Sequence, residues 1–555
     1  MATVKISQLP PASGALSSTD VFPAVQSGTT VKATSGLLSY QPSGAGAVTT
    51  TIQAKLRQIV SVKDFGAVGD GVTDDTAAGT AALATGKSIY WPTGTYKVSP
   101  IASPAPHSEP NRTSAWELAD GQVMFGDGAQ SKLLWGTPAT RQCFFKAADC
   151  VDVALRNLSF DGGYSSIIVD PDTDGSVDGV VVENCYFKNL LIDVLGGNQL
   201  AIDSSSKYAK NITVRGCSTA GPTVHSVLFT NCYNAQATGN QFNNVTGGFC
   251  VNASQGSRNV IISNNTADTC EYFCKVESSD TAAVNPAKFA SHEIVIANNT
   301  AINVDIYGIF INGAADHISV TGNVMVGFSN TGVFLDQVVG YSHTGAVVVS
   351  GNVLSAAPAS TNAIGINDAL STGTSPHVFA DNVIDEVLIG IKISRKNAVI
   401  TGGSLVSDSS CIVLNVPAII DGVVICGVKM KGAGGVNADG VGQPVKRLTV
   451  TGCDIDFTGV AIFTNAATSQ SIFSNNTITS AAPTVGGIVL TSPTNCSIQN
   501  NTLNLNGTSV DAITNSTAIN DSIVVGNICT RPITLVSPSA GTINTGNITN
   551  AAYVA

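Results

Sequence analysis

The sequence is poor in charged and aromatic residues, which make up 12% and 6% of its 555 residues. It contains no run of about 18 apolar residues and no basic segment followed by an apolar one, so it predicts neither a membrane span nor an N-terminal secretion signal. Lys and Arg form no run, and the net charge of -11 argues against nucleic acid as the main partner. We therefore expect a soluble protein that does not insert into a membrane.

Common catalytic and metal-binding patterns are also missing. There is no G-x-S-x-G, H-E-x-x-H or P-loop sequence, so serine esterases, zinc peptidases and NTPases lack support. The thirteen cysteines are an odd number and lack the paired spacing of a zinc site. We interpret them as small buried residues of a chain that folds in a reducing cytoplasm, with Cys270 and Cys274 as free thiols. We predict no metal and no cofactor.

The sequence is rich in a repeat of short alternating strands. Each unit opens on a strand that ends at a polar break, as in IVIANN at 294 and ISVTGN at 318, and the breaks recur about 20 to 34 residues apart. The period of two and the abundance of Val, Ile and Thr exclude helical repeats, and the spacing fits neither a leucine-rich repeat nor a propeller. We predict an all-β fold, a parallel β-helix with three strands per coil, in which corner Asn residues stack into a ladder.

Two segments near the N-terminus carry a resemblance to a known family. KISQLPPAS followed by VFPAVQSGTTVKAT resembles the attachment module of bacteriophage tail fibres and tailspikes. SVKDFGAVGDGVTDDT, with WPTGTY after it, resembles the start of the pectate-lyase-like right-handed β-helix of phage tailspikes. The resemblance implies a right-handed parallel β-helix, a homotrimer, and an N-terminal module that binds a phage tail or baseplate protein. A disordered leader is the alternative for that module.

These segments divide the chain into four expected parts. Residues 1–50 form the attachment module and linker, residues 51–115 a neck helix and the N-terminal cap of the coils, residues 116–548 the β-helix with its substrate groove, and residues 549–555 a C-terminal tail. Apolar side chains recur at helical spacing in TIQAKLRQIV, and a bundle of three chains would bury them.

Asp74 and Asp75 suggest a catalytic pair, because polygalacturonases of the same superfamily carry an Asp-Asp. Both aspartates precede the coils, however, and stand at the start of an alanine-rich helix, where carboxylates suit free backbone N–H groups. The chain lacks the Gly-His-Gly and Arg-Ile-Lys signatures of those enzymes. We interpret the two aspartates as helix caps, so the resemblance carries over no catalytic residue.

One column of third-strand residues holds the best candidates for catalysis. The aligned strands mostly end in Asn, as at Asn312 and Asn367, but two of them end at Glu277 and Asp336. Two rungs separate their backbones by about 9 to 10 Å, near the spacing of an inverting glycosidase pair. Such an acid can also be an ordinary corner residue, and in similar tailspikes the acids sometimes lie on facing subunits.

Further residues complete the predicted site. Asp305, on the intermediate rung, is the third catalytic candidate, since neighbouring like charges suit one of the carboxyls to an acid role. The loops 278–293 and 336–345 are expected to wall the groove. Four other histidines, at 225, 292, 317 and 377, are expected to be surface or groove hydrogen-bonding groups. The predicted substrate-binding residues are Glu271, Tyr272, Tyr307, Asn312, Tyr341, His343 and Arg395.

The resemblance and the carboxylates together predict a virion protein that binds and hydrolyses a bacterial surface polysaccharide, such as capsule or O-antigen, outside the host cell. One alternative is a lyase acting on an acidic sugar, which needs a cation such as Lys275, Lys288 or Arg395 near the uronate. The other alternative is a receptor-binding fibre without enzymatic activity.

Overall fold

The fold was analysed in a computed structural model of the chain. The structure describes residues 21–34, 39–99, 113–135, 142–171, 176–197, 209–220, 224–277, 291–313, 315–336, 345–370, 375–415, 419–438, 443–481, 483–506 and 510–549.

The N-terminal part contains two small antiparallel pairs and a short helix. β1 (Val21–Gln26) pairs with β2 (Thr29–Thr34), and β3 (Ser39–Tyr40) pairs with β4 (Thr50–Thr51). The predicted neck helix is α1 (Ile52–Leu56), which Thr51 caps by accepting a hydrogen bond from the backbone N–H of Ala54 at 3.0 Å. No side chain of this helix is buried, and Leu56 is 72% exposed.

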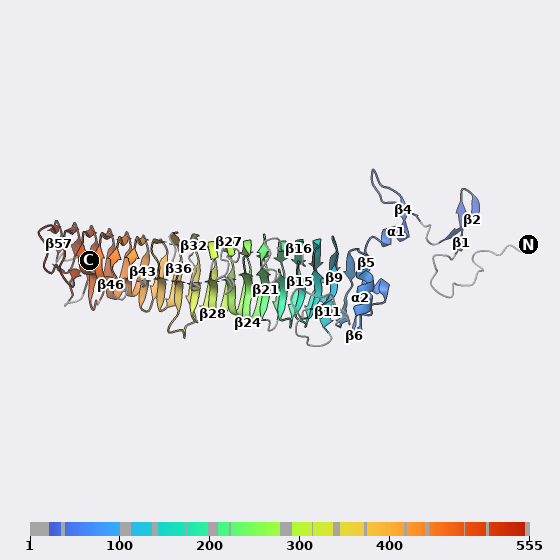
Figure 1. The fold of residues 1–555 in the computed structure, drawn as a ribbon, viewed down its shortest axis with the longest axis horizontal. Coiled ribbons are helices and arrows are strands. Elements are labelled where there is room, and N and C mark those ends of the chain that lie inside the picture. The colour runs from blue at the N-terminus through green and yellow to red at the C-terminus, as the bar shows by residue number, and fades with distance from the viewer. Residues whose placement is uncertain are drawn as a thin grey trace, which may run out of the picture.

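From Val60 onward the chain winds into coils whose strands pair in parallel, stacked into one long rod (Figure 1). The first strands of the coils form one ladder. Its members are β5 (Val60–Ser61), β7 (Ile89–Trp91), β10 (Val123–Gly126), β13 (Val151–Arg156), β16 (Val177–Glu183), β19 (Ala209–Arg215), β22 (Cys232–Tyr233), β23 (Gln236–Thr238), β25 (Arg258–Ser263), β27 (Ser291–Ala297), β29 (Ala315–Thr321), β32 (Val347–Ser350), β35 (His377–Ala380), β38 (Ala398–Thr401), β42 (Val424–Cys426), β45 (Thr449–Thr451), β47 (Ile472–Ser474), β50 (Ser497–Gln499), β53 (Ile523–Val525) and β56 (Ile543–Thr545).

The second and third strands form the other faces of the rod, from β6 (Asp70–Asp74) to β57 (Ile548–Thr549). In the middle of the rod the second and third strands of a coil merge into single long strands, β24 (Gln241–Ser254), β26 (Thr266–Glu277) and β28 (Thr300–Asn312). The next coil divides again into β30 (Val324–Phe328) and β31 (Thr331–Asp336). The predicted right-handed parallel β-helix is confirmed.

Alternation along the strands builds the core. Val260 and Ile262 of β25 lie beside Ile294 and Ile296 of β27, and all four side chains are fully buried. Identical register in each coil therefore stacks inward-facing residues into continuous apolar columns. All thirteen cysteines are free, as predicted for Cys270 and Cys274, and all but Cys426 are buried.

The Asn-Asn breaks have a defined geometry. The first Asn, such as Asn298, has a φ of 56°, in the left-handed region that Asn tolerates, and Gly322 takes the same place one coil later at 65°. The second Asn is buried: Asn299 Nδ2 donates to Ile262 O and to Asn323 Oδ1, each at 2.9 Å. Equivalent bonds join Asn240, Asn265, Asn299, Asn323, Asn352 and Asn382 in one series, and Asn476, Asn501, Asn527 and Asn547 in another. The predicted Asn ladder is confirmed.

Asn299→Ala is expected to lower the unfolding midpoint in urea markedly, because two N–H groups of Asn265 lose their acceptor and Ile262 O loses its side-chain donor. Asn323 Oδ1 would keep only the backbone N–H of residue 299 as a donor. Each buried unpaired polar group costs about 1–3 kcal/mol. The matched control is Asn298→Gly, which the left-handed backbone accepts and which is expected to leave the midpoint nearly unchanged. Equal midpoints for the two variants would show that the Asn ladder does not contribute to stability.

The Asp-Asp motif lies at α2 (Thr76–Leu83), the helix at the N-terminal end of the rod in Figure 1. Asp74 accepts a hydrogen bond from the backbone N–H of Thr76 at 3.0 Å, as a cap does. The expectation for Asp75 is wrong: its side chain makes no cap bond to the helix, and its carboxylate accepts the N–H groups of Val68 and Gly69 at 2.7 and 3.1 Å. Asp75 therefore fixes the GAVGD turn against the helix.

Neither α1 nor α2, nor any other helix in the described ranges, has the length and apolar content to cross a membrane.

A buried polar cluster interrupts the apolar core at Asp193 of β18 (Ile192–Gly196). Thr219 donates to Asp193 Oδ2 at 2.6 Å, Ser226 donates to the same oxygen, and Oδ1 has no partner within the described structure. Burial raises the pKa of Asp193 to about 7, and the two hydroxyl bonds only partly offset this effect.

Stability is consequently expected to fall as pH rises through this range. The pKa of Asp193 is higher in the folded chain than the value of about 3.9 expected after unfolding, so the folded state binds the proton more tightly. Its stabilising contribution is complete below about pH 4 and is lost as pH approaches 7. Between pH 5 and pH 8 the melting temperature of Asp193→Asn should therefore drop less than that of the wild type. An equal drop would mean that Asp193 is not the titrating group.

Candidate functional site

Five aromatic rings stack across successive coils in the middle of the rod. We call Phe249, Tyr272, Tyr307, Phe310 and Phe334 the aromatic ladder; all are half-buried, unlike the inward-facing residues beside them. The Phe249 and Tyr272 ring centroids are 4.6 Å apart, and those of Tyr272 and Tyr307 are 5.6 Å apart. Phe310 and Phe334 stack at 5.3 Å and each contacts Tyr307. The ladder thus presents flat apolar faces along the rod axis.

The long strands bring these rings into line. β24 and β26 pair in parallel, but their register shifts between the Val245 pair and the Phe249 pair. A similar shift between β26 and β28 lies just before Tyr272 and Tyr307. Because such an irregularity re-aims the strand, the rings that follow it stack on one face. His225 extends the stack on the N-terminal side, 5.5 Å from Phe249.

The predicted carboxylate column lies along the edge of the ladder. Glu277 pairs in register with Asn312, and Asn312 with Asp336, so two rungs separate the two acids as expected. The same alignment is wrong for Asn367, which pairs with Phe334 rather than with Asp336. Its neighbour Asp368 occupies the inward position beside Leu335 and is buried. The column of Asn residues is therefore interrupted at that coil.

Lys275 connects the acids to the rings. Its ammonium lies 4.8 Å from the ring centroid of Phe249 and 5.8 Å from that of Phe310, and it forms an ion pair with Glu277. Asn252 Nδ2 donates to the other oxygen of Glu277 at 3.0 Å. Glu277 is thus held from two sides by its neighbours.

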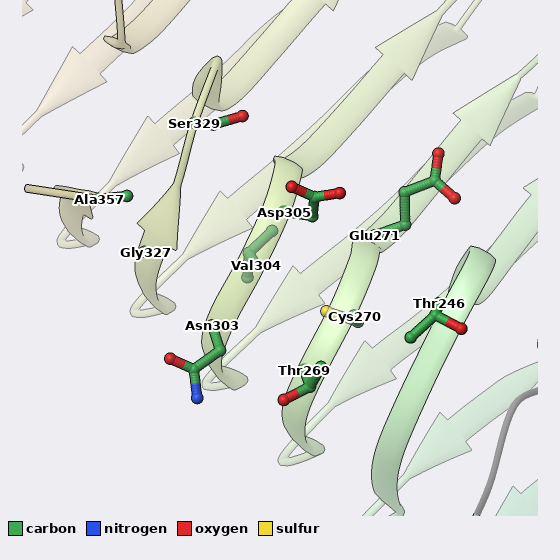
Figure 2. A pocket seen from close by; sticks show the side chains of 10 residues that line it. All are labelled: Thr246, Thr269, Cys270, Glu271, Asn303, Val304, Asp305, Gly327, Ser329 and Ala357. Atoms are coloured by element: carbon green, nitrogen blue, oxygen red, sulfur yellow. The ribbon is translucent and has the colours of Figure 1, made fainter. Parts of the chain in front are cut away.

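A pocket of about 450 Å³ opens at the bulges beside the ladder. Figure 2 shows Glu271 and Asp305 on adjacent strands of this pocket, with Ser329 beyond the end of the next strand. Asn303 lies in it as well, and its Nδ2 donates to Asp268 Oδ1 at 2.8 Å. The remaining lining residues are Thr246, Thr269, Cys270, Val304, Gly327 and Ala357.

Both tyrosines of the ladder have phenols that resist ionisation. Burial, followed by the negative charge of Glu271, raises the pKa of Tyr272. Burial, followed by the negative charge of Asp336, raises the pKa of Tyr307. These phenols therefore remain hydrogen-bond donors near neutral pH, with a carboxylate at each side of the ladder.

The structure gathers most of the predicted site residues and removes one. Five of them, together with the two acids of the column, lie on the paired strands β26, β28 and β31: Glu271, Tyr272, Asp305, Tyr307 and Asn312. Arg395 does not: it is 1% exposed and contacts His377, Ser375 O and Lys396 O. Tyr341 and His343, and most of the two loops expected to wall the groove, lie outside the described residues.

His377 also differs from the sequence interpretation as a surface or groove group. It is fully buried, and its Nδ1 lies 2.9 Å from Asp368 Oδ2 while Arg395 contacts Nε2. A buried cation needs such partners, so Asp368, His377 and Arg395 form a structural cluster inside the coils.

Sequence reasoning missed three rings of the ladder, Phe249, Phe310 and Phe334. A signal existed for two of them, because GIFIN and GVFLD place Phe at the same position, two residues before Asn312 and Asp336.

Among the residues with described positions, no group of three or more His, Cys, Asp or Glu side chains is arranged to hold a metal ion.

The aromatic ladder and the carboxylates beside it suit a carbohydrate polymer. Ring faces stack on the apolar faces of sugars, while phenols, amides and carboxylates meet their hydroxyls. Carboxylates spaced along the same face supply the proton donor and acceptor that cleavage of a glycosidic bond requires.

Comparison with known proteins gives the relatives of the chain. Residues 59–312 match the family model described as rhamnogalacturonase A/epimerase, pectate lyase-like. A tail spike protein of an Escherichia phage is 41% identical over 91 residues, which are 16% of this chain and 11% of the relative. The mannuronan C5-epimerase AlgE4 of Azotobacter vinelandii is 32% identical over 130 residues, 21% of either chain. The chain thus spans only a small part of the length of these relatives.

Among solved structures, the tailspike protein of E. coli bacteriophage HK620 in complex with a hexasaccharide is similar, with a TM-score of 0.48 and 14% identity over 85% of this chain and 82% of that chain. The α-1,3-glucanase of family GH87 from Streptomyces thermodiastaticus has a TM-score of 0.36 and 14% identity over 94% and 72%. The family match and the coiled fold confirm the resemblance of the SVKDFGAVGDGVTDDT segment to the start of a pectate-lyase-like β-helix. The chain is thus a parallel β-helix protein in which residues 59–312 match a pectate-lyase-like family model, and part of it is similar to a phage tail spike protein.

Proposed function

We propose that this protein is a phage tailspike that binds a bacterial surface polysaccharide along the aromatic ladder and cleaves it by glycoside hydrolysis. The observation that carries the proposal is the row of stacked rings bordered by carboxylates on both sides. The kinship with a phage tail spike protein supports the substrate class and the place of action, the tail of the virion at the host surface.

Glu277 and Asp336 are the proposed catalytic pair. Their strands are two rungs apart, about 9 to 10 Å at the backbone, which leaves room for a water between the carboxyls as an inverting mechanism requires. One acid would protonate the leaving oxygen and the other would activate the water. Asp305 is the third catalytic candidate, and Glu271, Tyr272, Tyr307 and Asn312 would hold the sugar.

Assembly into a homotrimer and attachment through residues 1–50 complete the proposal. The exposed apolar side chains of α1, with Ile52 at 40% and Leu56 at 72%, suit a bundle with two further copies of this short helix. Three equivalent grooves on one particle would raise avidity for a repeating polymer.

A second candidate function is a lyase or epimerase reaction on a uronate. Lys275 inside the site and the similarity to mannuronan C5-epimerases favour it. Both reactions begin with removal of the proton next to the uronate carboxylate, which a nearby cation assists.

One assay separates these reactions. The purified protein is incubated in deuterated water with bacterial surface polysaccharides, followed by measurement of reducing ends, the ultraviolet absorbance of unsaturated uronate, and deuterium in the recovered sugar. Hydrolysis predicts new reducing ends alone. Added absorbance would indicate a lyase, carbon-bound deuterium without shortening an epimerase, and binding without any change a receptor-binding fibre.

A further inference from the structure

We propose that the aromatic ladder selects an uncharged glycan and discriminates against polymers of uronate, sialate or phosphate-bearing sugars. This inference rests on the proposed function, because it names the substrate class of the same site. It is drawn from the balance of charge around the rings.

Negative charge concentrates at the ladder. Residues 241–336 contain eight acidic and three basic residues, a net charge of -5, while the whole chain of 555 residues carries -11. The four strands that supply the rings, β24, β26, β28 and β31, carry five carboxylates: Asp268, Glu271, Glu277, Asp305 and Asp336. An anionic sugar placed on the rings would meet like charge from several directions.

The one cation on these strands is already paired with a carboxylate. Lys275 is the only Lys or Arg on those four strands, its side chain is 17% exposed, and it forms an ion pair with Glu277. Its position over Phe249 and Phe310 keeps it against the ring faces. To bind a substrate carboxylate, Lys275 would have to leave Glu277, and Glu277 would then face that anion without its partner.

The rings act in the same direction. The face of an aromatic ring carries partial negative charge, so it attracts apolar C–H faces and cations and repels anions. The sequence of the flanking segments outside the described structure does not reverse this balance, since residues 278–290 contain one Asp and one Lys and residues 337–344 contain no Asp, Glu, Lys or Arg.

The test is binding to an array of bacterial surface polysaccharides sorted into neutral and anionic members, at low and high NaCl, with EDTA and with added calcium. Three proteins are compared: wild type, the charge-conserving variant Glu277→Asp with Asp336→Glu, and the charge-removing variant Glu277→Gln with Asp336→Asn. Incubation in the cold limits cleavage, and circular dichroism shows that each variant is folded.

The expected ligands are neutral glycans whose Kd changes less than about twofold with salt, with anionic glycans at least tenfold weaker for the first two proteins. The charge-removing variant should narrow that gap. The inference is overturned if anionic glycans bind best, with a Kd that rises with salt, or if they bind equally well once calcium is present. Cleavage of an anionic polymer would contradict this inference but would agree with the proposed function. Failure to bind any glycan would contradict both.

Discussion

Replacing Glu277 by Gln and Asp336 by Asn in one variant is expected to abolish cleavage of the polysaccharide while the polymer is still bound. Each change removes a proton-transfer group and keeps the shape of the side chain, and such groups contribute about 10² to 10⁴ in rate. The loss should therefore exceed about 10²-fold for the double variant, measured as reducing ends released per minute.

The controls for this experiment come from the same chain. Asp456→Asn changes an exposed aspartate of β46 (Asp454–Ser469), in a coil remote from the ladder, and should leave the rate unchanged. Because Glu277→Gln deprives Lys275 of its ion partner, the melting temperature of the variant must be checked. A double variant that cuts at the wild-type rate would show that the pair is wrong. Glu271 and Asp305 would then be the next candidates for the catalytic pair. Their adjacent strands are about 4.8 Å apart, near the carboxyl spacing of a retaining pair.

The second large effect is expected from Tyr307→Ala. Tyr307 contacts Tyr272, Phe310 and Phe334, so its ring is the centre of the ladder. Removing a ring that stacks on a sugar should weaken binding by about 1–3 kcal/mol, which is roughly 5-fold to 150-fold in Kd. Binding is measured with the cleavage-deficient double variant as background, so that the polymer stays intact.

Tyr233→Ala is the matched control, because Tyr233 is 40% exposed and lies on β22 (Cys232–Tyr233), in the first-strand ladder rather than on the third strands. Its Kd should equal that of the background. If Tyr307→Ala binds as tightly as Tyr233→Ala, the polymer does not lie on the ladder, and the proposed site has to be moved.

Much of the fold is predictable from the sequence, because each coil repeats the same local rules. The polar breaks predicted a ladder of stacked corner Asn residues, which the structure shows at Asn299, although the left-handed backbone at Asn298 and the burial of the ladder came from the structure. Period-two alternation predicted which side chains of β25 and β27 point inward. The column of Glu277, Asn312 and Asp336 followed from aligning three strands of equal length.

What failed depends on interactions between coils that no local pattern records. The register shift before Tyr272 sets where the rings stack, and it arises from the long merged strands rather than from a residue motif. The predicted alignment placed Asn367 beside Asp336, but in the structure Asn367 pairs with Phe334, two residues earlier. Asp368 takes the inward position there and contacts His377. Arg395 is buried in the same cluster, where it contacts His377. The prediction that it binds substrate was therefore wrong, because a basic residue near a strand end need not face the solvent.

The most direct test of the central claim is a crystal structure of the Glu277→Gln, Asp336→Asn variant with an oligosaccharide from a polymer that the wild type cleaves. The account predicts sugar rings stacked on Tyr272, Tyr307 and Phe334, with a glycosidic oxygen between positions 277 and 336. An oligosaccharide bound on another face of the rod, or across a boundary between subunits away from these rings, would contradict it.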